Sequence, residues 1–271
     1  MWHLSVPKIL HVYWGGGRLP YARFMTVKSF MRLNPTWEIM LWQPSLHAPV
    51  VTWHTHELDY GGIYNDYMPE LMALPIESKI INFEDYGFGN TMSEVHKSDF
   101  IRLHILSTIG GVWSDMDIIF FKPIDKLRVN IPENEFADTF VSICEYGHSI
   151  GFFMATKYNM FFKALAGLAK KEFNATTYQG MGSLMFNKYF PTIESINKVN
   201  IAVNIGMEAV YPHDSNNAKE IYDGTKPNFT EGTIGLHWYA GSNMAGDFLN
   251  KTNGGMTNLS DNIIGNLLKN E

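Results

Sequence analysis

The sequence predicts an α/β fold that opens with parallel strands joined by a helix. Residues 7–14 form a mostly apolar run that ends at Gly15–Gly17, which indicates a buried first strand. Residues 21–34 repeat apolar side chains at helical spacing, and Pro35 ends that helix. Residues 36–42 again have the character of a strand. A strand, a helix and a second strand of these lengths are typical of a parallel unit, because parallel strands need a long crossover.

The middle of the chain contains the strongest helix pattern. Residues 44–75 have no clear period and predict a loop with short helices, and residues 78–83 predict a strand. Residues 91–109 carry apolar side chains around most of a helix circumference, so we expect a helix that is buried on more than one side. Gly110 is its C-terminal stop, and a short acidic strand follows.

The second half of the chain continues this alternation. No repeat, low-complexity tract or linker divides the sequence, so we expect one domain over residues 1–271. The expected strands lie at 140–144, 151–156, 200–203, 209–211 and 235–239, with the third and fourth paired to each other. The expected helices lie at 159–173, 178–190 and 260–268, and an Asn- and Gly-rich stretch precedes the last one.

Composition narrows the class of protein. The 271 residues are 45% hydrophobic and 18% charged, which is enough apolar material for a sizeable core. A net charge of -6 argues against a nucleic-acid partner, because no basic stripe is available to displace counterions. The single cysteine, Cys144, excludes an intramolecular disulfide and fits a reducing compartment. Without a signal-peptide pattern or a long apolar window, we expect a cytoplasmic protein with no transmembrane segment.

Asp115 and Asp117 are the first candidates for chemistry. Side chains alternate along a strand, so two acids one residue apart leave the same face. Apolar stretches at 112–113 and 118–121 flank them, and burying unpaired carboxylates there is costly. A divalent cation that is shared with a diphosphate stabilises such a pair. The alternative is a solvated turn that contains two acids.

Asp99, Arg102 and His237 are further candidates with ordinary alternatives. Asp99 and Arg102 lie three residues apart on a helix, so they either pair on its surface or present the Arg fork to a phosphate or ribose. His237 is either a structural histidine or a third ligand for the cation. His54 and His56 are the only other histidines with a spacing that suggests metal, and one such pair is a weak signal.

The end of the first strand is a candidate nucleotide-binding edge. Tyr13 and Trp14 come directly before Gly15 and Gly16. The glycines let backbone approach a ligand closely. Trp14 is either a core residue or an aromatic face on which a nucleobase stacks.

These segments together resemble the D-x-D sugar-binding glycosyltransferases, which include initiating mannosyltransferases and capsule-type bacterial enzymes, and more distantly the glucosylating clostridial toxins. Residues 6–16 (VPKILHVYWGG) are similar to the opening strand I-P-K-I-I-H-x-x-W-G-G. Residues 98–106 and 110–117 (GGVWSDMD) match the central signature S-D-x-x-R-x-x-x-L, then G-G-x-Y-x-D-x-D. Residues 237–242 (HWYAGS) resemble a late H-x-W-x-G-S-W-type stretch.

The resemblance implies a GT-A fold, which is a Rossmann-like α/β sandwich with a mixed central sheet flanked by helices. It also implies a Mn²⁺ or Mg²⁺ ion and transfer of a hexose, with retention, from a UDP- or GDP-linked sugar to a glycan or another hydroxyl acceptor. Residues 1–120 would form mainly the nucleotide-sugar and metal half, and residues 121–271 mainly the sugar and acceptor half.

The resemblance assigns roles by position. Trp14 would stack on the base, Asp99 and Arg102 would fix sugar or ribose and diphosphate, Asp115 would contact the ribose and the shell of the ion, Asp117 would ligate the ion, and His237 would be a further ligand or a diphosphate contact.

Some positions depart from the family pattern. Trp113 replaces the usual Tyr, and Asn243 stands at the position of a final Trp. Gly151 stands where an Asn is common, and residues 179–181 (QGM) replace a T-G-P stretch. The donor sugar and the acceptor therefore stay open.

Retention requires either a carboxylate beneath the sugar or attack on the face from which the leaving group departs. Glu145 follows a strand and is the candidate nucleophile, although a surface acid is the simpler assignment. No other nucleophile is evident, which favours same-face attack, with a diphosphate oxygen taking the proton of the acceptor.

Two other functions stay open. A haloacid-dehalogenase-type phosphohydrolase also uses D-x-D, but it needs a later acid pair, whereas Asp214, Asp223 and Asp247 stand singly. A non-catalytic nucleotide-sugar or glycan-binding protein is the second alternative.

Overall fold

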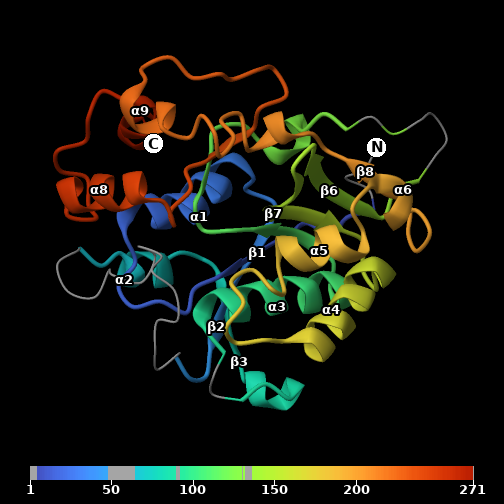
Figure 1. Cartoon of the computed structure of the whole chain (residues 1–271). Helices are drawn as coiled ribbons and strands as arrows, with labels where there is room; N and C mark the ends of the chain where they lie inside the picture. The colour runs from blue at the N-terminus through green and yellow to red at the C-terminus, as the bar shows by residue number, and fades with distance from the viewer. Residues whose placement is uncertain (1–4, 48–64, 90–91, 130, 132–135, 271) are drawn as a thin grey trace.

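The structure is a computed structural model that describes residues 5–47, 65–89, 92–129, 131 and 136–270. Its core is a seven-stranded sheet with the order β3-β2-β1-β4-β7-β6-β8 (Figure 1). A separate two-stranded sheet joins β5 (Ile118–Phe120) and β9 (Gly235–His237). The strands of the main sheet are β1 (Ile9–Tyr13), β2 (Glu38–Pro44), β3 (Glu77–Ile81), β4 (Gly111–Ser114), β6 (Thr139–Cys144), β7 (Gly147–Ala155) and β8 (Ala202–Asn204).

Strand direction divides the main sheet into two parts. β1 pairs in parallel with β2 and β4, and β2 pairs in parallel with β3. β7 runs antiparallel to β4 and β6, whereas β8 is parallel to β6. The predicted parallel strand-helix-strand opening and the predicted mixed α/β sheet are therefore confirmed.

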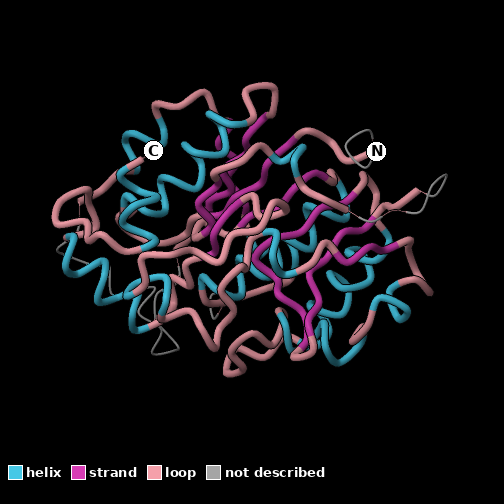
Figure 2. Tube along the Cα trace, turned by 90° about the horizontal axis from the view of Figure 1, so that it is seen from above, coloured by secondary structure: helices cyan, strands magenta, loops and turns pink. Residues whose placement is uncertain are grey.

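Helices cover both faces of the main sheet. Figure 1 shows α3, α4 and α5 on one side and α1, α8 and α9 on the other, and Figure 2 shows the strands running between helices. Each side has its own cluster of buried apolar side chains. The α-helices of the described residues are α1 (Tyr21–Leu33), α2 (Met68–Met72), α3 (Glu94–Thr108), α4 (Met160–Glu172), α5 (Ser183–Tyr189), α6 (Ile193–Ile196), α7 (Glu220–Asp223), α8 (Asn243–Thr252) and α9 (Ile263–Lys269).

Helix α3 leads into the strand that carries the site. The Ser93 side chain caps its first turn, because the hydroxyl oxygen accepts a hydrogen bond from His96 N–H at 3.2 Å. Phe100, Ile101 and Leu103 are fully buried and point in different directions around the helix axis, since successive residues are about 100° apart. The expectation of a helix buried on more than one side is confirmed.

Gly110 and Gly111 turn the chain from α3 into β4. Their φ angles are 73° and 102°, a region that other residues rarely adopt. A Cβ at Gly110 would lie 2.6 Å from Lys157 N, and one at Gly111 would lie 2.7 Å from Ile9 O. The neighbouring His11 ring supports this turn, since its Nε2 lies 2.9 Å from Gly110 O. The two glycines thus let β4 pass close to β1 and β7.

The prediction that Asp115 and Asp117 share one face of a strand is wrong. β4 ends before Asp115 and β5 begins after Asp117, so both acids lie in the turn between them. The chain turns because Asp115 N–H still donates to Gly151 O at 2.7 Å, whereas β5 leaves the main sheet and pairs with β9. The turn is not solvated, however, since Asp117 is only 5% exposed.

The predicted pairing of residues 200–203 with residues 209–211 is also wrong. β8 pairs in parallel with β6, and a 3-10 helix, η5 (Met207–Ala209), overlaps the second segment. The carbonyls of Ala209 and Val210 instead accept hydrogen bonds from the chain around β9.

Two helices differ from expectation in the last part of the chain. The helix expected at 178–190 begins only at Ser183, because Gln179 has a positive φ of 55° and turns precede the helix. The Asn- and Gly-rich stretch contains α8, whose first turn is capped by the Ser242 hydroxyl accepting from Ala245 N–H at 3.2 Å.

Some expectations fall outside the described residues. His54 and His56 lie there, as do residues 48–64 of the expected loop. The short helix α2 lies in the described remainder of that loop. Among the described residues, no helix combines the length and the apolar character that crossing a membrane requires.

Candidate active site

Asp117 is buried in the turn after β4, and its carboxylate contacts residues of the last fifth of the chain. Its Oδ1 lies 3.1 Å from His237 Nε2, and its Oδ2 accepts a hydrogen bond from Ala240 N–H at 3.0 Å. Burial alone would raise the pKa of Asp117, but the charges and hydrogen bonds supplied by His237, Arg23 and Ala240 hold it below its usual value. The carboxylate is therefore ionised, as a cation ligand must be.

Arg102 connects α3 to the same turn. Its Nη2 lies 3.0 Å from Asp99 Oδ1 and 3.3 Å from Asp115 Oδ1. Its Nη1 donates to Ile150 O at 2.5 Å, and the guanidinium lies 5.2 Å from the centroid of the Trp113 ring. Burial lowers the pKa of Arg102, but the charges of Asp115 and Asp99 more than offset this and leave it raised. The expected Asp99–Arg102 pair is thus a buried ion pair that also holds Asp115.

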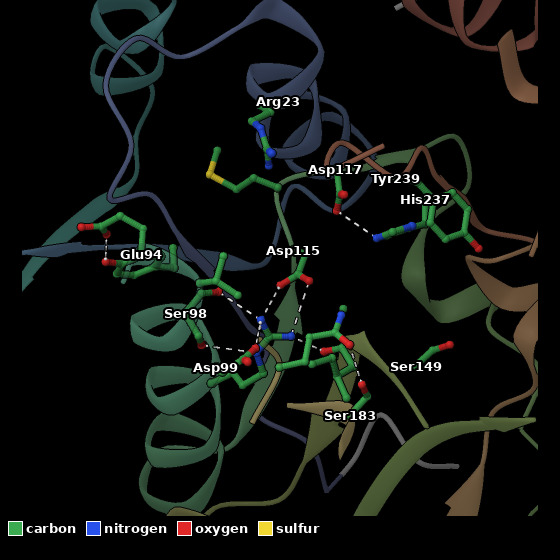
Figure 3. A pocket seen from close by; sticks show the side chains of 18 of the residues that line it. Arg23, Glu94, Ser98, Asp99, Asp115, Asp117, Ser149, Ser183, His237 and Tyr239 are labelled. Carbon is green, nitrogen blue, oxygen red and sulfur yellow. Dashed lines mark hydrogen bonds and ion pairs between the residues drawn. The ribbon is translucent and has the colours of Figure 1, made fainter. Parts of the chain in front are cut away.

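Asp115, Asp117 and His237 form a cluster that fits a cation. One ligand atom from each residue lies within 4.8 Å of the others (Figure 3). The Asp115 side chain stays 27% exposed, while Trp113 Nε1–H donates to its Oδ1 at 2.9 Å. Two carboxylates and an imidazole are a donor set that suits Mn²⁺, and carboxylates also suit Mg²⁺. The chemistry of these side chains therefore fits the ion that the resemblance implies.

The cluster lines a pocket of about 590 Å³. The pocket brings together the site residues expected from the sequence on β1, α3, the turn after β4, and β9, with the exception of Glu145. Its lining includes Tyr13, Trp14, Gly15, Gly16, Glu94, Asp99, Arg102, Asp115, Asp117, Ser149, Gly151, Gln179, Ser183, Tyr211, His237 and Tyr239. A cavity of this size is in the range of small-molecule and cofactor sites.

One edge of the pocket is formed by the end of β1. Tyr13 OH donates to Glu94 Oε2 at 2.5 Å, and a side chain on Gly15 would overlap that carboxylate. Trp14 is only 6% exposed, and a Cβ on Gly16 would lie 2.8 Å from its ring. Trp14 packs in the hydrophobic core and also lines the pocket. Its position is therefore compatible with a core role and with contact to a nucleobase.

Several pocket residues were not expected from the sequence. The guanidinium of Arg23 lies 5.0 Å from the Trp14 ring centroid and 5.6 Å from that of Trp238. An arginine among the apolar residues of the helix at 21–34 was the available signal. Tyr211 carried no signal, since it belongs to no recognisable motif and tyrosines are often buried in cores. Tyr239 lies within residues 237–242, the stretch that resembles the late family motif, and this was the available signal.

Glu145 has no place at this pocket. It lies exposed in the turn between β6 and β7, and it is not among the lining residues. β6 ends at Cys144 and pairs there with Gly147 of β7, so Glu145 lies in the tight turn between the two strands.

Comparisons with known proteins agree with the resemblance found in the sequence. Residues 22–136 match a family model described as "Glycosyltransferase sugar-binding region containing DXD motif". Over 127 residues the chain is 26% identical to subversion of eukaryotic traffic protein A of Legionella pneumophila, covering 44% of this chain and 18% of that protein. Over 123 residues it is 22% identical to inositol phosphoceramide mannosyltransferase 3 of Schizosaccharomyces pombe, covering 45% of this chain and 27% of that protein.

Solved structures also show likeness. The galactosyltransferase LgtC, in complex with donor and acceptor sugar analogues, is similar with a TM-score of 0.44 and 14% identity over 85% of this chain and 87% of that chain. The PaToxG glycosyltransferase is similar with a TM-score of 0.46 and 16% identity over 71% of this chain and 73% of that chain.

Proposed function

We propose that this chain is a metal-dependent, retaining hexosyltransferase, because residues 22–136 match the model of a DXD-containing glycosyltransferase sugar-binding region. Its donor is a UDP- or GDP-linked sugar, and its acceptor is a glycan or another hydroxyl compound. We assign the whole chain to one GT-A domain, and we propose a cytoplasmic role in polysaccharide biosynthesis.

One observation carries the proposal. Asp115, Asp117 and His237 bring their ligand atoms within 4.8 Å of one another on the wall of the pocket that Trp14 and Gly15 also line. A cation held by the cluster and a nucleotide held at the glycine edge would therefore share one cavity. This is the arrangement that a nucleoside diphosphate bridging metal and protein requires.

The chemistry of the site follows from charge. Breaking the bond between sugar and phosphate develops negative charge on the leaving diphosphate, and a divalent ion neutralises that charge. Asp115, Asp117 and His237 would hold the ion. Arg102 fixes Asp115 through its Nη1 and Nη2 atoms, at 3.4 and 3.3 Å from the two carboxylate oxygens. Positioned charges of this kind need little reorganisation when the bond breaks.

The state of the carboxylates in the pocket bears on which of the two retaining routes is used. Glu94 is paired with Lys97 at 2.8 Å and with the Tyr13 hydroxyl, and Asp99 is paired with Arg102. A carboxylate nucleophile must instead be free to attack the anomeric carbon. We therefore favour same-face attack, in which a diphosphate oxygen takes the proton of the acceptor hydroxyl as the new bond to the sugar forms.

Both halves of the chain contribute to the pocket. We propose that residues 1–120 supply the nucleotide edge and most of the metal cluster, with His237 joining from the second half. The wall around Ser149, Gln179 and Ser183 comes from residues 121–271 and would face the sugar and the acceptor.

A screen of donors tests the function. The protein is incubated with UDP- and GDP-linked hexoses, with Mn²⁺ or with a chelator, and released nucleoside diphosphate and free sugar are measured. We expect slow hydrolysis of one nucleotide sugar that depends on the metal. The α-anomer of the sugar, as first released from an α-linked donor, would support retention.

The same screen separates the alternatives. A non-catalytic binder would be stabilised against heat by a nucleotide sugar but would not cleave it. A phosphohydrolase would cleave phosphate monoesters and leave the nucleotide sugar intact. Either pattern would contradict the proposed function.

A further inference from the structure

Tyr211 is a buried tyrosine whose hydroxyl group is not used by the described part of the protein. The side chain is 5% exposed and lines the same pocket. Its ring centroid lies 5.0 Å from that of His237. Its hydroxyl forms no hydrogen bond with any residue that the structure describes. Burying a hydroxyl without a hydrogen-bond partner destabilises a fold, so such groups are rare unless a ligand uses them.

The hydroxyl of Tyr211 lies beside the acidic turn. A Cβ built on Gly151 would lie 2.9 Å from Tyr211 Oη and 3.0 Å from Asp115 Oδ2. The two oxygens therefore flank the same point above the backbone of β7. Any side chain at position 151 would occupy the space between them, so glycine keeps this space open.

The chemistry of the phenol determines what it can bind. A tyrosine hydroxyl is neutral at ordinary pH, because its usual pKa is about 10. It can therefore donate one hydrogen bond to an oxygen of a ligand.

From this geometry we propose that Tyr211 is a further substrate-binding residue of the transfer site. Its hydroxyl donates a hydrogen bond to an oxygen of the bound nucleotide sugar in the space above Gly151. That oxygen belongs either to the transferred sugar or to the diphosphate, and in both cases an oxygen of the donor accepts the bond from the phenol. The inference rests on the proposed function, because it needs a nucleotide sugar in this pocket.

Tyr211→Phe tests the proposal because it removes only the hydroxyl oxygen and its proton. We expect the Tm of the ligand-free variant to stay the same or rise, since no internal hydrogen bond is lost. We expect kcat/KM for donor hydrolysis to fall on the order of tenfold to a hundredfold, as for a lost hydrogen bond to a charged or polar substrate. The Tm shift that the donor and Mn²⁺ produce should shrink in parallel.

Tyr239→Phe is the matched control in the same pocket. Tyr239 OH donates a hydrogen bond to His213 O at 2.7 Å. Removal of the Tyr239 hydroxyl should therefore lower the Tm of the ligand-free protein. Tyr158→Phe, at a side chain that is 71% exposed and outside the pocket lining, should change neither Tm nor hydrolysis.

Two probes identify the oxygen. If the diphosphate accepts the bond, Tyr211→Phe weakens the Tm shift by both the nucleoside diphosphate and the nucleotide sugar. If the sugar accepts it, only the nucleotide sugar loses stabilisation. Unchanged kinetics and an unchanged donor shift in Tyr211→Phe, with an active wild type, would overturn the proposal alone. A wild type that neither binds nor cleaves any nucleotide sugar would overturn the proposed function as well.

Discussion

His237 Nε2 lies 3.1 Å from Asp117 Oδ1, so the acidic turn after β4 is completed by a residue close to the other end of the chain. β5 and β9 create this contact, because their antiparallel pairing sets Ile118 opposite His237. The metal cluster is thus assembled by tertiary contacts between distant segments. We therefore expect replacement of each of its residues to have a different effect on metal binding and turnover.

Asp117→Asn should remove metal-dependent turnover with little effect on folding. The amide oxygen can still accept the hydrogen bond from Ala240 N–H, but the negative charge that holds a cation is lost. We expect donor hydrolysis to fall on the order of a hundredfold or more. The control is Asp125→Asn, at an exposed acid in a short 3-10 helix, which should keep wild-type turnover. Near-normal turnover in Asp117→Asn would contradict the site assignment.

His237→Gln should weaken metal binding more than it weakens the chemistry at saturating metal. The substitution removes an imidazole ligand but leaves both carboxylates. We expect the Mn²⁺ concentration for half-maximal hydrolysis to rise by at least about tenfold. His104→Gln, on α3 and outside the pocket, is the matched control. Equal Mn²⁺ requirements in the wild type and His237→Gln would show that His237 is structural.

Arg102 should contribute to both stability and activity, and two substitutions separate these contributions. Arg102→Ala leaves the buried Asp99 and its neighbour Asp115 without their counter-charge, so the free energy of unfolding should fall by about 3–5 kcal/mol. Arg102→Lys keeps the charge but not the fork that contacts both acids. We expect Arg102→Lys to fold with a smaller loss of unfolding free energy, as measured by urea denaturation. We also expect it to lose most of its activity in donor hydrolysis. Wild-type activity in the Lys variant would argue against a positioning role.

His11 should make stability depend on pH. Burial lowers the pKa of His11 from 6.5 to about 4, against the opposing effect of its hydrogen bond to Gly110 O. The unfolded chain therefore takes up a proton below about pH 6.5 that the folded state resists. The associated stability is present above that pH and is lost as the pH falls toward 4, by about 3 kcal/mol for this shift.

A pH series of urea denaturation curves for the wild type and His11→Gln measures this contribution. The difference in unfolding free energy between the two proteins should narrow as the pH is lowered from 7 to 4. A constant difference across that range would mean that His11 does not titrate as its environment implies.

Gly111→Ala should strain the backbone that leads to the site. Its φ is 102° and a Cβ would approach Ile9 O to 2.7 Å, so the free energy of unfolding should fall by more than about 2 kcal/mol. Gly167→Ala, in helix α4 with no atom within 4 Å of the new Cβ, should instead gain up to about 1 kcal/mol. Equal stability of the two variants would contradict the requirement for glycine at 111.

Much of the fold was predictable because local patterns and global packing agree. The spacing of apolar residues predicted α1 and α3, and Pro35 and Gly110 predicted their ends. Partners remote in sequence were harder to predict. Whether the stretch at 209–211 would pair with 200–203 or with β9 depends on tertiary contacts that no local period encodes.

The candidate site shows the same division. Asp99, Arg102, Asp115, Asp117 and His237 were expected from their motifs, and the structure brings them to one pocket. The motif predicted the convergence of Asp115 and Asp117 but not its geometry, because a turn replaces the strand. Arg23 and Tyr211 reach the pocket only through packing, so no motif marks them.

Binding of Mn²⁺ is the most direct test of the central claim that these acids hold an ion against a nucleoside diphosphate. Electron paramagnetic resonance counts free Mn²⁺ as it is titrated into the protein with UDP or GDP, for the wild type and for Asp117→Asn. The account predicts one bound ion per chain that tightens with one of the nucleotides and is lost in the variant. Equal Mn²⁺ binding by both proteins, or none by the wild type with either nucleotide, would contradict it.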